Sequence, residues 1–338
     1  MILDPHKSEG KRMGLRAFVA KRAVYSFILV FLVITINFAI FMVRDPLEML
    51  ASGKKLRPAQ IEELQRRFGL LDPLHVRYLK YLQNLLTFQF GYSYRTGQSI
   101  SEEVSSRLSN TLTLCITAEF IAIAVGLIFG VIAASKRGKI ADTLFSIFAV
   151  VTQGLPVFWI GMLLLLVFAY NLSWFPLGHS FPPEWAIHGR PDNFLIELVI
   201  RFQYLFLPAL TLVIITVGGY VLLTRASMLE VLSEDYLTTL KAKGVSNTKI
   251  LFKHALKNAS LPIITQVAMA FAFTLSGAIV TETIFTYPGL GMWIWDSIEK
   301  WDYPALQAIF YIISLCVIVA NFLVDIVYGI IDPRIRYG

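Results

Sequence analysis

The sequence has few charged residues and little that could carry out chemistry. Only 16% of its 338 residues are charged, whereas 56% are hydrophobic. Soluble domains have about 25% charged residues and about 45–50% apolar ones. The mean hydropathy is +0.63. A soluble enzyme or a disordered chain could not keep so much apolar surface solvated. The composition therefore predicts an integral membrane protein.

Cysteine and histidine are too few and too scattered for a disulfide scaffold or a metal site. The two cysteines, Cys115 and Cys316, both lie within apolar runs, and none of the five histidines has metal-ligand spacing. The sequence also lacks the G-x-x-x-x-G-K-[ST] pattern of a nucleotide-binding P-loop. We therefore predict no catalytic residue, no bound metal and no cofactor.

The sequence does have six apolar runs that could each cross a bilayer as a helix. About 20 residues at 1.5 Å per residue cover the ~30 Å hydrocarbon core. The predicted spans are 23–43, 110–134, 144–170, 206–223, 263–285 and 305–331. The first is too long for the apolar part of a signal peptide, and no small-residue cleavage site follows it. The prediction is an all-α membrane protein with six transmembrane helices.

The distribution of lysine and arginine predicts that both termini face the cytoplasm. In that orientation, seventeen of these residues fall in the segments 1–22, 135–143, 224–262 and 332–338. The two short outer loops hold three, Arg190, Arg201 and Lys300. The segment 44–109, predicted to be extracytoplasmic, is long enough to escape the positive-inside rule. Membrane topology thus explains most of the net charge of +7 without a nucleic-acid partner, and the lipid bilayer is the predicted environment.

The predicted extracytoplasmic segment 44–109 has helical patterns of its own. One pattern runs from Pro58 to a stop at Gly69. A second begins with Asp72 as N-cap and Pro73 as the first helical residue. Its apolar side chains recur at helical spacing at Tyr78, Leu82, Leu85 and Leu86. These helices would either pack on the mouth of the bundle or dock an extracytoplasmic partner.

The loop 224–262 carries the most information, because it is far longer than a turn between neighbouring spans. Ser233 is predicted to cap a first short helix, which Gly244 would end. Acids at its start and lysines at its end suit the helix dipole. The residues singled out are Ser233, Glu234, Asp235, Tyr236, Lys241, Ala242, Lys243 and Gly244.

A second short helix is predicted from Ser246 or Asn247 to Asn258, and the loop would end at 261–262. Lys249, Lys253 and Lys257 form a basic stripe along it. Two interpretations remain open. The small residues of the first helix suit a lever on which another protein seats, whereas the lysine stripe suits an interfacial helix on anionic headgroups.

The sequence resembles the permease subunits of ABC importers. The loop resembles their EAA-type loop, and several further motifs, in order along the chain, resemble the branch that serves dipeptides, oligopeptides and nickel. The loop motifs are RASMLEVLSEDY (225–236), KAKG (241–244) and HALKNASLP (254–262). The others are FGLLDP (68–73), GYSYRTG (91–97), GLPVFW (154–159), ETIF (282–285), PGLG (288–291), and Asp325 with DPRIR (332–336). The glycine-to-LP spacing is longer than in the sugar permeases, and Thr239-Leu240 replaces the expected small residues. The pattern of the second loop helix resembles the peptide branch instead.

This resemblance implies a type I ABC importer permease fold and half of a translocation pathway. A second, homologous permease subunit would supply the other half. Two ATP-binding cassette ATPase subunits would bind the ATP, and the segment 233–244 would be the coupling helix between them and this chain. An extracytoplasmic solute-binding protein would deliver peptides to the complex in the cell membrane. Oligosaccharides or nickel are alternative cargoes.

Ionisable and helix-breaking residues at membrane depth are candidates for pathway or structural roles. Glu119 would face cargo or accept an interhelical hydrogen bond. Glu282 and Asp325 lie near span ends, where a cap or a helix-to-helix bond is favoured. Gly154 and Pro156 predict a kink that either lines the pathway or shapes packing.

Two other classes of protein fit the sequence less well. A stand-alone channel or ion-driven secondary transporter would show inverted repeats with broken helices, and it would leave the 224–262 loop unexplained. An intramembrane enzyme would need a catalytic set such as H-E-x-x-H in the spans, and none is there. The permease subunit is therefore the preferred hypothesis.

Overall fold

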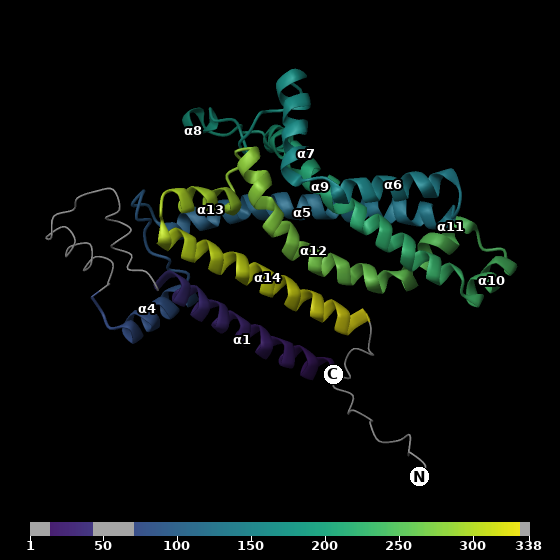
Figure 1. Cartoon of the computed structure of the whole chain (residues 1–338), viewed down its shortest axis with the longest axis horizontal. Coiled ribbons are helices and arrows are strands. Elements are labelled where there is room, and N and C mark those ends of the chain that lie inside the picture. Colours follow the sequence, from purple (N-terminus) through teal and green to yellow (C-terminus); the bar gives the residue numbers. More distant parts are fainter. Residues whose placement is uncertain (1–13, 43–70, 332–338) are drawn as a thin grey trace, which may run out of the picture. The chain divides into compact units, whose positions relative to one another are not determined.

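A computed structural model describes residues 14–42 and 71–331 (Figure 1). Within these ranges the chain is helical, and the one β-type contact is a bridge between Tyr92 and Ser99. The described residues fall into two compact units. Among these residues, unit 1 is formed from 14–42, 71–100 and 301–331, and unit 2 from 101–300.

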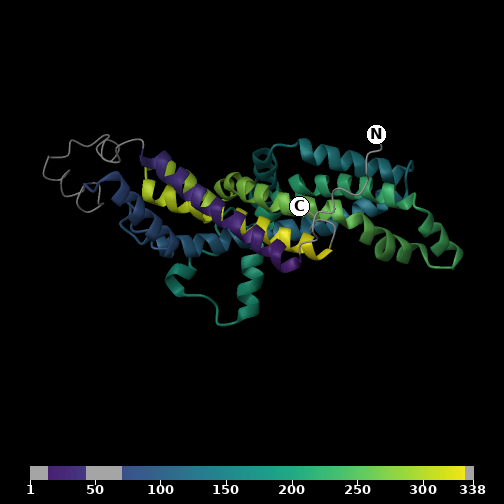
Figure 2. The same ribbon diagram turned by 90° about the horizontal axis from the view of Figure 1, so that it is seen from below.

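Unit 1 contains α1 (Leu15–Met42), α4 (Leu74–Leu86) and α14 (Tyr303–Ile331). Helices α1 and α14 lie side by side in both Figure 1 and Figure 2. Helix α4 lies against α1, where the ring of Phe38 is 5.2 Å from that of Tyr78 and 5.4 Å from that of Tyr81. Helix α4 thus packs within its unit, which favours the first interpretation of the predicted outer helices.

Unit 2 is built around α9, whose buried face lies in the largest apolar cluster. The elements of this unit are α5 (Ile100–Ser135), α6 (Ile140–Gly154), α7 (Val157–Leu164), η1 (Leu165–Asn171), α8 (Trp185–His188), α9 (Phe194–Leu232), α10 (Asp235–Ala242), α11 (Asn247–Lys249), η2 (Ile250–Ala255), α12 (Leu256–Ile284) and α13 (Leu290–Glu299). The two η segments are π-helical. Leu114 of α5, Ala149 of α6 and Leu212 of α9 meet in this cluster.

Small residues allow the helices of unit 2 to approach closely. A Cβ atom on Gly126 would overlap Tyr220, and one on Gly130 would overlap Thr224. A Cβ atom on Gly218 of α9 would overlap the carbonyl of Ala149 in α6. Such glycines let backbones touch in membrane bundles, where lipid provides no hydrophobic force between helices. Gly218 therefore has a packing role between α9 and α6.

Four helices of the described ranges are long and apolar enough to cross a membrane: α1, α5, α9 and α14. They cover the predicted spans 23–43, 110–134, 206–223 and 305–331, apart from Val43, which lies outside the described residues. Helices α5 and α9 are much longer than predicted, at 36 and 39 residues. The predicted fifth span, 263–285, lies on α12, which is not among these four. The predicted count of six is therefore only partly confirmed.

The third predicted span is not one helix with a kink. Gly154 ends α6 and Val157 begins α7, and the two halves are bent by 101°. Leu155 is extended at ψ 133° because the Pro156 ring disfavours a helical residue before it, and Pro156 has no N–H to continue α6. If this broken pair is a single span, the number of candidate spans becomes five.

The helix boundaries predicted at Asn258 and Asp72 are wrong. The second loop helix does not end at Asn258, because α11, η2 and α12 form one continuous helical path that passes through Pro262 inside α12. A proline removes only one hydrogen bond from a long helix that its neighbours hold in place. Pro73, rather than Asp72, is the N-cap residue of α4. Asp72 instead accepts a hydrogen bond from Lys80, 2.6 Å away. The predicted helix 58–69 lies outside the described residues.

Candidate functional site

Helix α10 forms the first limb of a hairpin, residues 233–258, at the end of unit 2 where α5 and α9 finish (Figures 1 and 2). Glu234 is the N-cap residue in an extended conformation, and Asp235 lies in the first turn. Ser233 is not the N-cap as predicted. It ends α9 instead, and its hydroxyl donates a 2.6 Å hydrogen bond to the carbonyl of Glu230. Glu234, one residue later, takes the N-cap position of α10.

Gly244 ends α10 as the sequence predicts. Its φ is +75°, a left-handed conformation that glycine adopts without steric cost. The N–H of Gly244 donates to the carbonyl of Lys241 at 3.0 Å, and that of Val245 donates to the carbonyl of Leu240 at 3.2 Å. These two bonds form a Schellman motif, which satisfies the last carbonyls of the helix and turns the chain back.

The underside of the hairpin is held by apolar contacts with the ends of two long helices. Leu237 of α10 is 2% exposed. It shares a buried cluster, the hairpin core, with Val131 and Ala134 of α5, Met228 of α9, and Ile250, Ala255 and Ala259 of the second limb. The hairpin therefore has a fixed base on α5 and α9 and does not hang as a free loop.

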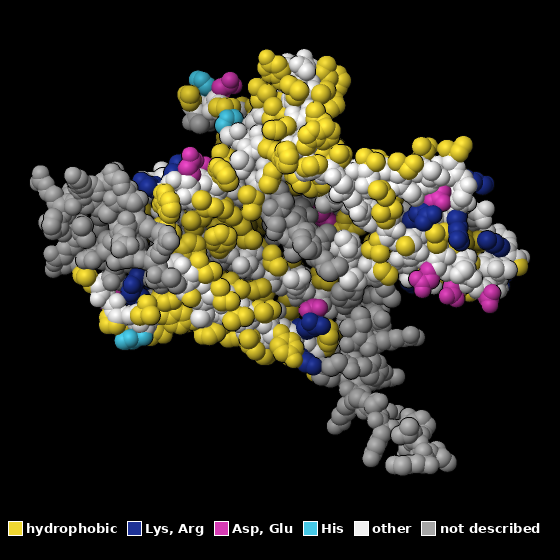
Figure 3. Space-filling view, viewed as in Figure 1, with side chains coloured by type: hydrophobic (Ala, Val, Ile, Leu, Met, Phe, Trp, Pro, Cys, Tyr) yellow, Lys and Arg dark blue, Asp and Glu magenta, His cyan; other side chains and the backbone are white. Residues whose placement is uncertain are grey.

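The tip of the hairpin is an open, small-residue surface. Lys241, Ala242, Lys243 and Gly244 are all exposed, and no atom lies within 4 Å of the place that a Cβ on Gly244 would occupy. Charged side chains of both signs gather over α10 and α11 in Figure 3. A partner could thus approach the backbone at Ala242 and Gly244 between charged neighbours.

The second limb carries the basic stripe on its open side. Lys249, Lys253 and Lys257 are exposed, whereas Ile250 and Ala255 are buried. Ala255 follows Ile250 by five residues, which is the hydrogen-bond spacing of a π-helix, so the two side chains lie on the same, buried face. The exposed lysines lie on a different face. Ser246 occupies the N-cap position, but its side chain makes no capping hydrogen bond. Asn258 donates to the Tyr236 hydroxyl at 2.9 Å and joins the two limbs.

Glu119 is a buried side chain within the α5–α9 interface. It is 4% exposed and accepts a short hydrogen bond from the hydroxyl of Tyr220, itself 1% exposed. This contact matches the interhelical hydrogen bond that was one of the two interpretations of Glu119.

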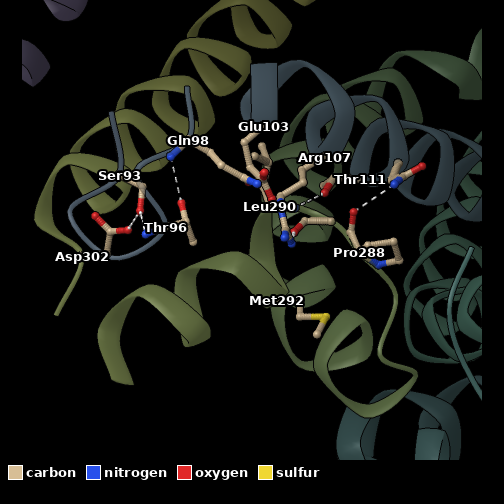
Figure 4. Close-up of polar contacts among 12 residues, drawn as sticks. Ser93, Thr96, Gln98, Glu103, Arg107, Thr111, Pro288, Leu290, Met292 and Asp302 are labelled. Atoms are coloured by element: carbon tan, nitrogen blue, oxygen red, sulfur yellow. Dashed lines mark hydrogen bonds and ion pairs between the residues drawn. The ribbon is translucent and has the colours of Figure 1, made fainter. Parts of the chain in front are cut away.

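Glu282 lies at the centre of a buried polar cluster that we call the Glu282 knot. The knot comprises Thr111, Glu282 and the turn 288–292. The Thr111 hydroxyl donates to the carboxylate at 2.6 Å, and the N–H of Met292 donates to it at 3.0 Å. The N–H of Leu290 in turn donates to Thr111 at 2.8 Å (Figure 4). The Glu282 carboxylate thereby accepts a hydrogen bond in the first turn of α13, where the helix has unpaired N–H groups and its dipole favours a negative charge.

Two glycines of the PGLG motif pack tightly against the segment 279–282 of α12. A Cβ atom on Gly289 would overlap the carboxylate of Glu282, and one on Gly291 would overlap the backbone of Ile279. In Figure 4, Arg107 and Thr111 extend from α5 towards Pro288 and Leu290. Of the two roles expected of Glu282, a cap or a helix-to-helix bond, the bond to Met292 matches the first and the bond to Thr111 of α5 matches the second.

Asp325 makes a helix-to-helix bond within unit 1. Its carboxylate lies 3.1 Å from the guanidinium of Arg22, joining α14 to α1. Arg22 also lies over the ring of Phe18, 5.5 Å from its centroid. Glu119, Glu282 and Asp325 thus all have structural partners. Within the described ranges, no three Asp, Glu, His or Cys side chains come together as metal ligands would.

Gly154 and Pro156 form an open break between α6 and α7. Among the described residues, no atom beyond its chain neighbours lies within 4 Å of the position of a Cβ on Gly154, which is the last residue of α6. The break itself is confirmed, whereas a place on the translocation pathway stays a prediction.

Several buried polar residues were not singled out from the sequence. Asp142 of α6 binds Arg225 of α9 through two hydrogen bonds, of 2.5 and 3.0 Å. Thr111 belongs to the Glu282 knot. In unit 1, Asp302 accepts a short bond from Ser93 and a 3.1 Å bond from the N–H of Tyr94, which explains the GYSYRTG motif (Figure 4). The sequence did offer one sign that Asp142 and Asp302 could be buried, because each is an acid inside or beside an apolar run.

Burial also changes the chemistry of the loop that Asp302 holds. It raises the pKa of the Tyr94 phenol to about 12, because the apolar surroundings disfavour the charged form. The Tyr94 phenol is therefore harder to ionise than one in water.

The sequence matches two family descriptions along most of its length. Residues 126–337 match "Binding-protein-dependent transport system inner membrane component". Residues 15–115 match the N-terminal region of such membrane components.

Curated relatives match the chain almost from end to end. The di/tripeptide transport system permease protein DppB of Pseudomonas aeruginosa is 34% identical over 95% of this chain and 99% of its own. The oligopeptide transport system permease protein AppB of Bacillus subtilis is 34% identical over 96% of this chain and 100% of its own. The glutathione transport system permease protein GsiC of Salmonella paratyphi A is 36% identical over 92% of this chain and 95% of its own.

A solved structure shares the fold. The MetNI methionine ABC transporter, in an inward-facing conformation, contains a chain that matches with a TM-score of 0.54 at 12% identity. The match covers 68% of the present chain and 96% of that chain. At this identity, the likeness concerns the fold alone.

Proposed function

The chain belongs to the family of binding-protein-dependent transport system inner membrane components, and on this premise we propose that it is the permease subunit of a peptide ABC importer. It is a multi-pass membrane protein and a permease component of an ABC transport system. Relatives that match it over more than nine-tenths of its length are named for di/tripeptides, oligopeptides and glutathione. Peptides are therefore favoured over oligosaccharides and nickel as cargo.

The 233–258 hairpin would be the coupling element that receives force from an ATPase. Helix α9 has 39 residues and a length of about 58 Å, roughly twice the ~30 Å hydrocarbon core. Its last nine residues, beyond 223, would carry α10 about 14 Å past the apolar part of the helix. That distance favours a lever in water over a helix that lies on headgroups.

The observation that carries this proposal is the combination of an exposed tip with a fixed base. Ala242 and Gly244 offer backbone access, while Leu237 ties the tip to α5 and α9 through the hairpin core. A force applied to such a tip reaches the long helices, since a packed apolar cluster transmits displacement instead of absorbing it.

The partners follow from what this chain lacks. It has no P-loop, so two separate ATPase subunits would bind and hydrolyse the ATP. A second, homologous permease subunit would complete the pathway, and an extracytoplasmic solute-binding protein would deliver the peptide. The hairpin and both termini would face the cytoplasm.

The test is a complex assembled from this chain and the transport proteins encoded with it, reconstituted in liposomes. We expect ATP hydrolysis that peptide-loaded binding protein stimulates, together with uptake of labelled peptide. Replacing Ala242 by Glu should abolish that stimulation, because a bulky charge would occupy the contact surface. Ala242 is exposed and helical, so the bundle should stay folded.

Lys253→Glu is the matched control, since it places the same charge on the other limb. Full stimulation in Ala242→Glu would show that the tip is not the coupling contact. Loss in Lys253→Glu alone would favour the headgroup interpretation of the stripe. Peptide uptake without any ATPase would instead point to a stand-alone transporter.

A further inference from the structure

The geometry points to a second connection between the hairpin and the broken pair α6–α7, the ion pair of Asp142 and Arg225. We propose that this pair is the joint that makes α6 follow the hairpin, so that both residues are positioning residues for coupling. The inference rests on the proposed function, because it concerns how movement of the hairpin reaches the rest of the chain.

The contact has the features of a specific joint. The Nε atom of Arg225 lies 2.5 Å from one Asp142 oxygen, and an Nη atom lies 3.0 Å from the other. This fork-to-fork arrangement fixes direction as well as distance. Asp142 is 6% exposed, and it also accepts the N–H of Gly138 at 2.9 Å. The carboxylate therefore holds α9 and the turn before α6 at the same time.

The joint lies beside the base of the hairpin. Arg225 precedes Met228 by three residues on α9, and Met228 is fully buried in the hairpin core. On the other side, the turn that Asp142 holds follows directly after α5, whose Ala134 belongs to the same core. The ion pair thus joins α6 to the two helices on which the hairpin is built.

A second contact fixes the orientation of α6 relative to α9. Gly218 lies seven residues before Arg225 and touches Ala149, which lies seven residues after Asp142. Seven residues are two helical turns, so both contacts fall on one face of antiparallel helices α6 and α9. Two fixed points prevent α6 from rotating against α9. Movement of the hairpin end of α9 must then carry α6 up to Gly154, where the 101° bend begins.

An ion pair that transmits movement and an ion pair that only supports the fold predict different effects on ATP hydrolysis and peptide transport. If the pair transmits movement, weakening it should let ATP hydrolysis continue while less peptide is carried per ATP. If it only supports the fold, hydrolysis and transport should fall together with the amount of assembled complex.

The experiment uses Asp142→Asn and Arg225→Lys in the full complex, with peptide uptake and peptide-stimulated ATP hydrolysis measured on the same liposomes. Asn keeps the size and one acceptor, while Lys keeps the charge and loses the fork. We expect the ratio of uptake to hydrolysis to fall at least five-fold in each. The exchanged pair Asp142→Arg with Arg225→Asp should regain at least half of the ratio. Asp72→Asn is the matched control, because Asp72 pairs with Lys80 at an exposed site on unit 1.

The outcomes separate the two proposals. An unchanged ratio in both single variants overturns the joint, and so does a failure of both to assemble, which would show a purely structural pair. A fall that the exchanged pair does not repair overturns it as well. Each of these results leaves the proposed function intact. The proposed function fails on the unaltered proteins instead, if the complex shows neither peptide-stimulated hydrolysis nor uptake, or if peptide is taken up without any ATPase.

Discussion

The two ends of α5 are held by different kinds of contact. At one end Thr111 enters the Glu282 knot, where a buried carboxylate and its donors are all paired. At the other end Val131 and Ala134 enter the hairpin core, which is apolar. A satisfied polar cluster has one geometry and is costly to disturb, whereas apolar packing accepts side chains of similar volume. We infer that both ends are fixed in place, but that the knot is rigid towards substitution whereas the hairpin core is adjustable, in the sense that it accepts other side chains of similar volume.

The largest effect is expected from Glu282→Ala. This change leaves the Thr111 hydroxyl and the Met292 N–H buried without their acceptor, which should cost about 3–5 kcal/mol of unfolding free energy. Thermal unfolding of the purified chain in lipid nanodiscs measures it. Glu103→Ala is the control, since Glu103 forms a partly exposed pair within one helix and should cost under about 1 kcal/mol. Equal losses would contradict the description of the knot as the rigid end.

Leu237→Ala tests the hairpin core. Removing a 2% exposed leucine should cost about 2–4 kcal/mol, felt mainly as local opening of 233–258. Hydrogen exchange should accelerate in the hairpin and stay unchanged near Glu282. Leu237→Met keeps the volume and should cost under about 1.5 kcal/mol. If Met disturbs the hairpin as much as Ala does, the core is not adjustable.

Gly289→Ala tests the tight packing of the knot with a single methyl group. The added Cβ would overlap the Glu282 carboxylate, so we expect a loss of about 1–3 kcal/mol in the same unfolding measurement. Gly154→Ala is the matched control. Its Cβ has open space, and its effect on stability should stay within about 0.5 kcal/mol. A destabilised Gly154→Ala protein would mean that the break between α6 and α7 is packed after all.

Gly244→Ala should have the smallest effect, because the tip of the hairpin is open. Only the left-handed backbone resists the change, at a cost of about 1–2 kcal/mol confined to the end of α10. Gly244→Asn should cost less, since asparagine tolerates this conformation. Hydrogen exchange at 240–246 distinguishes the two. A larger loss in Asn than in Ala would show that space, and not φ, limits this position.

The membrane spans were the most predictable part of the fold. Four of the six predicted spans coincide with long apolar helices, because about 20 apolar residues in a row leave few alternatives in a bilayer. Gly244 was equally predictable, since few residues other than glycine adopt its backbone conformation readily. The 101° bend was not, because Pro156 indicates a break but leaves its angle to the neighbours. The end of α9 was not predictable either, because a serine at 233 could equally end α9 or cap the helix that follows.

The partners of the buried acids lay beyond the sequence. Glu119, Glu282 and Asp325 were visible as acids in apolar runs, yet Tyr220, Thr111 and Arg22 lie 101, 171 and 303 positions away from them. A carboxylate needs a donor within about 3 Å, and many polar residues of the chain could have supplied it. Only the packing of α1 with α14 in unit 1, and of α5 with α9 and α12 in unit 2, selected one.

By itself, the sequence determined the class of protein, the main spans and the stop at Gly244, because hydropathy and glycine conformation are local properties. The tertiary structure decided which helices touch, that Asp142 binds Arg225, and that the Glu282 carboxylate occupies the space beside Gly289. These are contacts between distant segments. They exist only once the backbones approach closely enough for a missing Cβ or a single carboxylate to matter.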